Sequence, residues 1–314
     1  TRIPGVAVAA IADVNAEAAK ATAAQWRIPV ATADYTKLLM DPDIDAVAIC
    51  SSTDTHARII QEAAAAGKHI FCEKPIEYNL EKIDRALAAV AEAGVKLQIG
   101  FNRRFDANFR KAREIVHEGK IGAPHILRIT SRDPAPPPLS YVQVSGGIFL
   151  DMTIHDFDMA RFLIGSEVEE IYAAGGVMVD PRIGDVGDID TAVITLRFGN
   201  GTIGTIDNSR QAVYGYDQRV EVFGSAGMVT VANNTVDTHV YSNRDGVHMA
   251  KPLYFFLERY TDSFIAEMSA FVESIRQDTV PPVTGEDGRI PVVMAMAAKK
   301  SYLENRPVQL SEIS

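Results

Sequence analysis

Short apolar segments alternate with helix-forming segments through the first hundred residues of this 314-residue chain. The apolar segments cover residues 6–12, 45–50, 69–72 and 96–100, and the helix-forming segments cover residues 16–26, 35–40, 56–66 and 80–93. Strands that are apolar on both faces and separated by helices of about 10–15 residues form parallel sheets covered on both sides. The pattern predicts an α/β fold with a doubly wound parallel sheet.

From about residue 120 onward the strand-like segments alternate polar with apolar residues, which indicates a different kind of sheet. Residues 192–198 and 202–207 show this alternation on either side of the hairpin turn Gly199-Asn200-Gly201. Residues 219–224 and 228–231 repeat it. We therefore expect a second, α+β domain with a large antiparallel sheet. One face of that sheet is buried, and its open face is of the kind that packs on another subunit.

Composition excludes several classes of function. Hydrophobic residues make up 47% of the chain and charged residues 23%, and the net charge of -10 comes without any cluster of Lys and Arg. This balance argues against a nucleic-acid or anionic membrane surface. No apolar run reaches the roughly 20 residues of a membrane helix, and the opening stretch lacks the basic leader of a signal peptide. Cys50 and Cys72 end apolar runs, so we expect reduced, buried thiols in a cytoplasmic protein.

A doubly wound sheet usually binds a dinucleotide through a G-x-G-x-x-G turn after its first strand. That turn is absent here, because the chain opens with Thr1-Arg2-Ile3-Pro4-Gly5 and continues directly into an apolar strand. One strand, the glycine turn and most of a helix would require about 20–25 further residues upstream. We therefore expect the first domain to be truncated at its start.

Asp13 stands at the carboxyl end of the first apolar strand. An acidic side chain at this point accepts hydrogen bonds from the adenosine ribose, and its charge disfavours the additional 2′-phosphate of NADP. The position predicts NAD as the cofactor. The alternative is that Asp13 is a loop residue that caps the helix beginning at Ala16.

Residues 146–158 carry the strongest sign of catalysis. If they form one helix, Asp151, His155 and Asp158 lie at i, i+4 and i+7 on a single face beside an apolar stripe. An imidazole between two carboxylates is well suited to accept a proton near neutral pH. The same spacing also describes an ordinary solvated helix face, so the motif alone leaves both interpretations open.

Several short motifs occur in a specific order around this stretch. They are Gly67-Lys68-His69, Phe71-Cys72-Glu73-Lys74-Pro75, residues 100–105, residues 118–122 and residues 222–227. Together with residues 146–158 they closely resemble the glucose–fructose oxidoreductase/inositol dehydrogenase (Gfo/Idh/MocA) family. The resemblance covers nearly the whole chain and lacks only the first strand and the glycine turn.

The resemblance implies a domain organisation. Residues 1–101 would form a Rossmann domain that binds NAD, without its first strand and glycine turn. Residues 102–314 would form the substrate and oligomerisation domain, with the last helix packing back on the Rossmann domain. Members of the family often assemble into dimers or tetramers, so a homo-oligomer is expected. No set of His, Cys and carboxylate residues in the sequence suggests a metal site.

Within the family, the chain is most similar to the myo-inositol 2-dehydrogenases. The resemblance implies that Lys74, Asp151 and His155 are catalytic, and that the cofactor is bound by Asp13, Ser51, Glu73 and Lys74. Arg103, Asp133, Asp158 and Tyr216 would line the polyol pocket. Two positions depart from the pattern, since Asp133 stands where those enzymes carry asparagine and Asn102 replaces an apolar residue.

The expected reaction is oxidation of a secondary alcohol of a cyclic polyol, with hydride transfer to NAD. The most direct interpretation is myo-inositol oxidised to its 2-keto form, with His155 as general base oriented by Asp151. Lys74 would polarise the reacting oxygen, although a lysine with a lowered pKa could take the proton itself. Two alternatives stay open: a related dehydrogenase for scyllo-inositol, an aldose or an amino sugar, and a non-catalytic dinucleotide sensor.

Overall fold

The computed structural model describes residues 3–313, which divide into two compact units. The first unit extends to Phe101 and includes Ile265–Arg289, and the second comprises Asn102–Phe264 and the chain from Ile290 onward. Residues 102–314 were expected to form one domain whose last helix packs back on the first domain; in the structure Ile265–Arg289 belongs to the first unit. No helix among the described residues is both long enough and apolar enough to cross a membrane.

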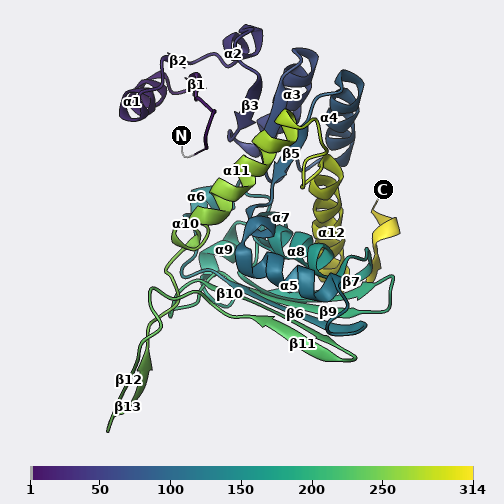
Figure 1. The fold of residues 1–314 in the computed structure, drawn as a ribbon. Coiled ribbons are helices and arrows are strands. Elements are labelled where there is room, and N and C mark those ends of the chain that lie inside the picture. The colour runs from purple at the N-terminus through teal and green to yellow at the C-terminus, as the bar shows by residue number, and fades with distance from the viewer. Residues whose placement is uncertain (1–2, 314) are drawn as a thin grey trace. The chain divides into compact units, whose positions relative to one another are not determined.

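The first unit has the doubly wound α/β architecture that the alternating pattern predicts. Its parallel strands form two sheets, one with the order β1-β2 and one with the order β3-β4-β5 (Figure 1). The strands are β1 (Ala10–Ala12), β2 (Val30–Thr32), β3 (Ala46–Ile49), β4 (His69–Glu73) and β5 (Leu97–Gly100). The helices between them are α1 (Ala16–Trp26), α2 (Thr36–Met40), α3 (Thr53–Ala65) and α4 (Leu80–Ala93).

Two expectations about this unit were wrong in detail. The first strand was expected over residues 6–12, but β1 covers only Ala10–Ala12, because β2, the strand that pairs with it, is itself three residues long. Residues 7–9 are exposed. Cys72 is buried as expected, but Cys50 is exposed, because it follows the end of β3.

Two later helices complete the first unit. They are α11 (Thr261–Arg276) and α12 (Gly285–Glu304), each of which contributes residues to both units. The amide of Ile99 in β5 donates to the Val283 carbonyl at 3.1 Å, and the side chain of Gln98 donates to the Glu267 carbonyl at 2.9 Å. Residues far apart in the sequence therefore bond directly to β5.

The second unit is built on a seven-stranded sheet with the order β11-β10-β6-β9-β8-β7-β14. The strands are β6 (Pro124–Arg132), β7 (Val168–Gly176), β8 (Thr191–Phe198), β9 (Ile203–Ser209), β10 (Asp217–Gly224), β11 (Gly227–Val231) and β14 (Val308–Gln309). All neighbouring pairs are antiparallel except β6 and β9, which run parallel. The expected large sheet is therefore present, with one parallel pair.

The alternating sequence of these strands gives the sheet two different faces. In β8, Ala192, Ile194 and Leu196 are buried whereas Val193 is about half exposed (52%). Helices α5 and α8 lie over the buried face, as Figure 1 shows. The helical segments of this unit are η1 (Asn102–Phe105), α5 (Ala107–His117), α6 (Leu139–Val142), α7 (Ile148–Asp151), α8 (Thr153–Ile164), α9 (Pro181–Asp185), α10 (Phe256–Arg259) and η2 (Leu310–Glu312). A separate hairpin of β12 (Val240–Asn243) and β13 (Gly246–Met249) is exposed along its length.

Candidate active site

The predicted catalytic stretch forms two helices rather than one. α7 ends at Asp151 and α8 begins at Thr153, with Met152 between them at φ -97° and ψ -58°. Asp151 is therefore the last residue of α7, whereas His155 and Asp158 lie on α8. The prediction of one continuous helix over residues 146–158 was wrong, because the buried hydroxyl of Thr153 binds the side chain of Asn208 at 2.6 Å and lies 3.3 Å from the Ile148 carbonyl.

The carboxylate of Asp151 is held from two sides. The hydroxyl of Tyr141 donates a hydrogen bond to Oδ1 at 2.7 Å, and Nη1 of Arg210 donates one to Oδ2 at 3.1 Å. Arg210 is a fully buried cation, with 1% of its surface exposed. A charge-assisted hydrogen bond from a buried guanidinium fixes the direction of that carboxylate.

Asp188 links the first residue of α7 to Arg210. Its Oδ1 accepts a hydrogen bond from the backbone amide of Ile148, the first residue of α7, at 3.0 Å. Its Oδ2 lies 3.6 Å from Nη2 of Arg210. Arg210 and Asp188 together therefore hold both ends of the short helix that presents Asp151. Neither residue is among those predicted from the sequence.

Arg103 lies in a buried network on the helix-covered face of the sheet. Its Nη1 donates to Asp156 at 2.6 Å, and its Nη2 donates to the hydroxyl of Tyr216 at 3.3 Å. Asn208 of β9 donates to the second oxygen of Asp156 at 2.8 Å. The structure thus brings together two residues predicted to bind substrate, Arg103 and Tyr216, and shows that Asp156 orients one of them.

Asp156 and Asn208 are not among the residues predicted from the sequence. Asp156 is adjacent to His155, but the helix spacing drew attention to Asp151 and Asp158 instead. Asn208 interrupts the apolar alternation of β9, since it is polar yet 1% exposed. A polar residue at a strand position expected to face the core was the signal that could have identified it.

Asp158, predicted to bind substrate, has a partner within the protein. Nε of Arg104 lies 3.0 and 2.9 Å from its two oxygens, and Nη2 lies 2.6 Å from Oδ1. The carboxylate is 1% exposed. This bidentate pair anchors α8 to η1, and the role of Asp158 toward substrate stays a prediction.

Asp133, which follows β6, lies in the field of four charged neighbours. Burial raises its pKa to about 6, and Asp151 and Asp156 act in the same direction, whereas Arg210 and Arg103 oppose the rise. Its backbone is fixed, because the amide of Asp133 donates to the Ser209 carbonyl at 2.9 Å. Asp133 therefore changes its charge in the mildly acidic range.

Three predicted cofactor residues lie at one edge of the β3-β4-β5 sheet. Ser51 follows β3, Glu73 ends β4 and Lys74 comes next. Burial raises the pKa of Glu73, with Lys74 opposing the rise. A Cβ on Gly100, at the end of β5, would lie 2.8 Å from Oε2 of Glu73, so only glycine lets the Glu73 side chain lie against β5.

Asp13 lies at the end of β1, in the other sheet of the first unit. Its Oδ1 accepts a hydrogen bond from the amide of Asn15 at 2.8 Å, and Asn15 in turn caps α1 through the amides of Glu17 and Ala18. The cap is therefore Asn15 and not Asp13. The side chain of Asp13 is exposed, as a carboxylate must be to receive ribose hydroxyls. The exposed carboxylate of Asp13 at the end of β1, together with Ser51 after β3 and Glu73 and Lys74 at the end of β4, fits the binding of a dinucleotide.

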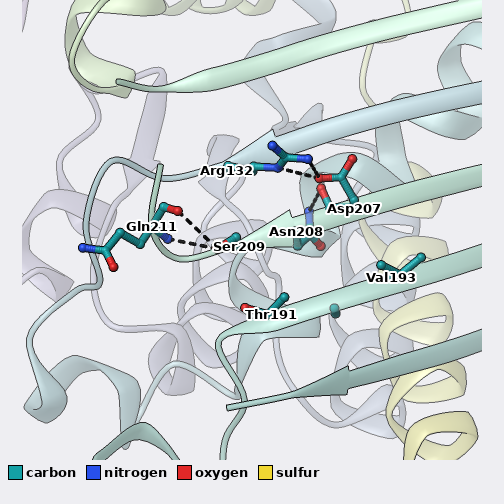
Figure 2. Close-up of a pocket in the computed structure, with 8 residues that line it drawn as sticks. Arg132, Thr191, Val193, Asp207, Asn208, Ser209 and Gln211 are labelled. Atoms are coloured by element: carbon teal, nitrogen blue, oxygen red, sulfur yellow. Dashed lines mark hydrogen bonds and ion pairs between the residues drawn. The ribbon is translucent and has the colours of Figure 1, made fainter. Parts of the chain in front are cut away.

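A separate hollow of 330 Å³ opens on the second unit, and Figure 2 shows the residues that line it. Arg132 and Asp207, on β6 and β9, are paired there at 2.6 Å. None of the predicted catalytic or substrate residues lines this hollow. Its charged groups bind one another, and we assign it no part in the chemistry.

Comparisons with known proteins cover both units. A family described as an oxidoreductase family with an NAD-binding Rossmann fold matches residues 1–101, and the GFO/IDH/MocA C-terminal domain matches residues 109–230. The chain is 52% identical to myo-inositol 2-dehydrogenase of Thermotoga maritima, over 97% of this chain and 91% of that protein. It is 43% identical to inositol 2-dehydrogenase of Rhizobium meliloti, over 96% and 91%.

A solved structure agrees with these sequence matches. The crystal structure of scyllo-inositol dehydrogenase from Lactobacillus casei, with bound NAD(H) and scyllo-inositol, superposes with a TM-score of 0.93. The two sequences are 31% identical, and the match covers 99% of this chain and 93% of that one. The chain belongs to the Gfo/Idh/MocA family of NAD-dependent oxidoreductases.

Proposed function

We propose that this protein oxidises a secondary alcohol of an inositol, with myo-inositol as substrate, 2-keto-myo-inositol as product and NAD as hydride acceptor. The observation that carries the proposal is the fixed carboxylate of Asp151, held by Tyr141 and buried Arg210 four residues before His155. The relationship to inositol dehydrogenases across almost the whole chain supports the choice of substrate.

In this mechanism His155 takes the proton of the reacting hydroxyl. A neutral imidazole accepts a proton near pH 7, and an anionic neighbour stabilises the imidazolium that results. In this proposal Asp151 would supply that negative charge, and its hydrogen bonds to Tyr141 and Arg210 fix the direction of its carboxylate. The proton therefore passes from the substrate oxygen to the ring of His155.

Lys74 stabilises the negative charge that develops on the substrate oxygen as its proton leaves. When NAD is bound, its nicotinamide accepts the hydride from the same carbon. Ser51, Glu73 and Lys74 would contact the cofactor from the edge of the β3-β4-β5 sheet, and Asp13 would receive the ribose hydroxyls. The charge of Asp13 makes NAD the preferred cofactor over NADP.

Arg103, Asp133, Asp158 and Tyr216 would recognise the ring hydroxyls. Burial raises the pKa of Tyr216 well above its ordinary value, although Arg103 opposes the rise, so the phenol keeps its proton and stays a donor. Carboxylates accept hydrogen bonds and Arg103 donates them, so the four residues offer both kinds of partner to a polyol. A set of this kind discriminates strongly against analogues that lack a hydroxyl.

The test is a steady-state assay of the full-length protein by NADH absorbance, with myo-inositol and its epimers and with NAD and NADP in parallel. His155→Ala should lower kcat by about 10²–10⁴-fold, the usual contribution of a positioned base, while NADH binding measured by fluorescence is retained. His125→Ala, at an exposed histidine of β6, is the matched control and should change neither quantity. Unchanged turnover in His155→Ala would reject His155 as the base.

The second candidate substrate is scyllo-inositol. The Lactobacillus casei protein bound to NAD(H) and scyllo-inositol shares this fold, and Asp133 departs from the asparagine expected in myo-inositol 2-dehydrogenases. An aspartate accepts at both oxygens, whereas an asparagine donates at one, so the two residues select different hydroxyl orientations. A higher kcat/KM for scyllo-inositol than for myo-inositol, reversed by Asp133→Asn, would favour this alternative.

A further inference from the structure

His56 is a buried histidine whose two ring nitrogens both meet backbone carbonyl oxygens. It lies in the first turns of α3 with 1% of its surface exposed. Nδ1 is 2.9 Å from the carbonyl oxygen of Pro75, and Nε2 is 2.9 Å from that of Ser51. These are good hydrogen-bond distances, and both acceptors belong to the main chain.

The two carbonyls belong to neighbouring loops of the first unit. Ser51 lies two residues beyond the end of β3, and Pro75 lies two residues beyond the end of β4. The strands run parallel with Ile49 opposite Cys72, so both loops leave the sheet at its carboxyl edge. Open α/β sheets bind their ligands at this edge. His56 therefore connects the two loops directly.

A backbone carbonyl oxygen can only accept a hydrogen bond. Each contact therefore holds its loop through a hydrogen bond only when the ring nitrogen donates it. A ring that carries both protons donates to both carbonyls, whereas a ring with one proton donates to one and turns a lone pair toward the other. A buried carbonyl that loses its hydrogen-bond donor is destabilising, because it is also shielded from the water that would otherwise bind it. Replacing the ring by a side chain whose donor reaches only one of the two carbonyls should therefore release the other loop.

We propose that His56 is a positioning residue that holds the Ser51 loop for cofactor binding and the Lys74-Pro75 loop for catalysis. The inference rests on the roles proposed above for Ser51 and Lys74. It assigns the two effects to different ring nitrogens: Nε2 acts on cofactor affinity through Ser51, and Nδ1 acts on turnover through the residue next to Lys74.

Two substitutions separate the contacts. The amide nitrogen of an asparagine reaches approximately the place of Nδ1, and that of a glutamine reaches approximately the place of Nε2. His56→Asn should therefore keep kcat within about twofold and weaken NADH binding by about 3–10-fold, the effect of one lost hydrogen bond. His56→Gln should show the reverse, with NADH affinity retained and kcat reduced by a similar factor. A merely structural role would not produce this exchange.

His69 provides the matched control. It begins β4 at the opposite end of the strand, where its Nδ1 accepts a hydrogen bond from the amide of Lys96 at 3.0 Å. The oxygen of an asparagine can replace that acceptor. His69→Asn should leave both kcat and NADH affinity within about twofold of the wild type.

Parallel losses of kcat and affinity in both His56 variants, or no change in either, would overturn the proposal. Wild-type protein that neither binds NADH nor turns over a polyol would instead refute the proposed function. The wild type also offers a measurement that needs no folded variant. With ¹⁵N-labelled histidine, saturating NADH should shift the ring resonances of His56, and resonances that do not move would equally overturn the inference.

Discussion

Arg210 is the residue on which the geometry of Asp151 depends most directly. Its guanidinium is buried and pairs with Asp151 at 3.1 Å and with Asp188 at 3.6 Å. Arg210→Met keeps much of the volume but leaves two carboxylates without their cation, which should cost about 3 kcal/mol of unfolding free energy. We expect kcat to fall by at least about tenfold while NADH affinity is unchanged.

The measurements for Arg210 are chemical denaturation, steady-state kinetics and NADH fluorescence titration. Arg161→Met is a suitable control, because Arg161 also pairs with a carboxylate, that of Glu167, at 2.6 Å, but this partner is largely exposed. A pair whose carboxylate stays in solvent should contribute no more than about 1 kcal/mol. Equal kcat for wild type and Arg210→Met would show that Asp151 needs no support from Arg210.

Asp133 should make stability depend on pH in an unusual direction. Its pKa in the folded protein is about 6, above the ordinary value of 3.8, so the folded state holds this proton more tightly than the unfolded chain does. The contribution of Asp133 to stability is therefore lost as pH rises from about 4 to about 6. Asp133→Asn removes the titration, and its unfolding free energy relative to wild type should increase over that range by about 2 kcal/mol.

Asp190 provides a comparison of opposite sign for the same denaturation series. Burial raises its pKa, but hydrogen bonds from the backbone amides of Met178, Asp180 and Val179 lower it by more, so the net shift is downward. Its stabilisation is present above the unfolded pKa and is lost as the pH falls below about 4. The deficit of Asp190→Asn should therefore shrink in acid. A flat difference between wild type and Asp133→Asn from pH 4 to 7 would contradict the prediction for Asp133.

At this scale the sequence predicts candidate charged residues but not the partners that hold them. Asp151, His155 and Arg103 follow from local spacing and motif order. Their partners Arg210 and Asp156 do not, because Arg210 comes 59 residues after Asp151 and meets it only through the fold. A pairing of this kind depends on the tertiary structure, which local periodicity does not encode.

At the scale of elements, Gly147 determines how α7 begins. Its backbone has φ 88° and ψ 171°, a conformation available almost only to glycine, and a Cβ would lie 2.9 Å from Oδ1 of Asp188. Gly147→Ala should therefore destabilise the protein by about 1–3 kcal/mol and lower kcat, since Asp188 also contacts Arg210. Thermal or urea denaturation with parallel kinetics would measure both effects.

Gly227→Ala is the matched control for this substitution. Gly227 begins β11, and a Cβ there would meet nothing within 4 Å. We expect its unfolding free energy to change by less than about 0.5 kcal/mol. If Gly147→Ala were as stable and as active as Gly227→Ala, the start of α7 would not constrain Asp151.

The elements themselves were largely predictable, and their boundaries less so. Helices α1, α3 and α4 follow from apolar periodicity and from endings such as Gly94, which has φ 66°. The division between α7 and α8 was not predictable, because Thr153 bonds to Asn208 on a distant strand. The parallel pairing of β6 with β9 was not predictable either, because both strands alternate polar and apolar residues as antiparallel strands do.

At the scale of the whole molecule, the open face of the seven-stranded sheet carries an apolar row. Phe223, Ile126 and Ile203 lie side by side on β10, β6 and β9, and they are 44%, 36% and 56% exposed. Exposed apolar side chains that form a continuous patch are typical of interaction surfaces. We therefore expect this face to pack on a second copy of the chain, as the open sheet in the sequence first suggested.

Ile203→Arg should shift the protein toward the monomer, because a charge at the centre of the row would be buried without a partner. Sedimentation velocity at several protein concentrations measures the change. Glu114→Arg, at a partly exposed position of α5 on the helix-covered side, should leave association unchanged. A wild type that is monomeric at all concentrations, or an Ile203→Arg protein that associates normally, would contradict the prediction.

The division of the first unit between two stretches of sequence has a consequence for how the protein is made. On the ribosome, strand β5 is synthesised long before Glu267 and Val283, the residues whose carbonyls it binds. Phe71 is likewise synthesised long before Phe271, the residue whose ring centroid lies 6.0 Å from its own. The segment that is translated first therefore reaches its final packing only after most of the second unit has left the exit tunnel.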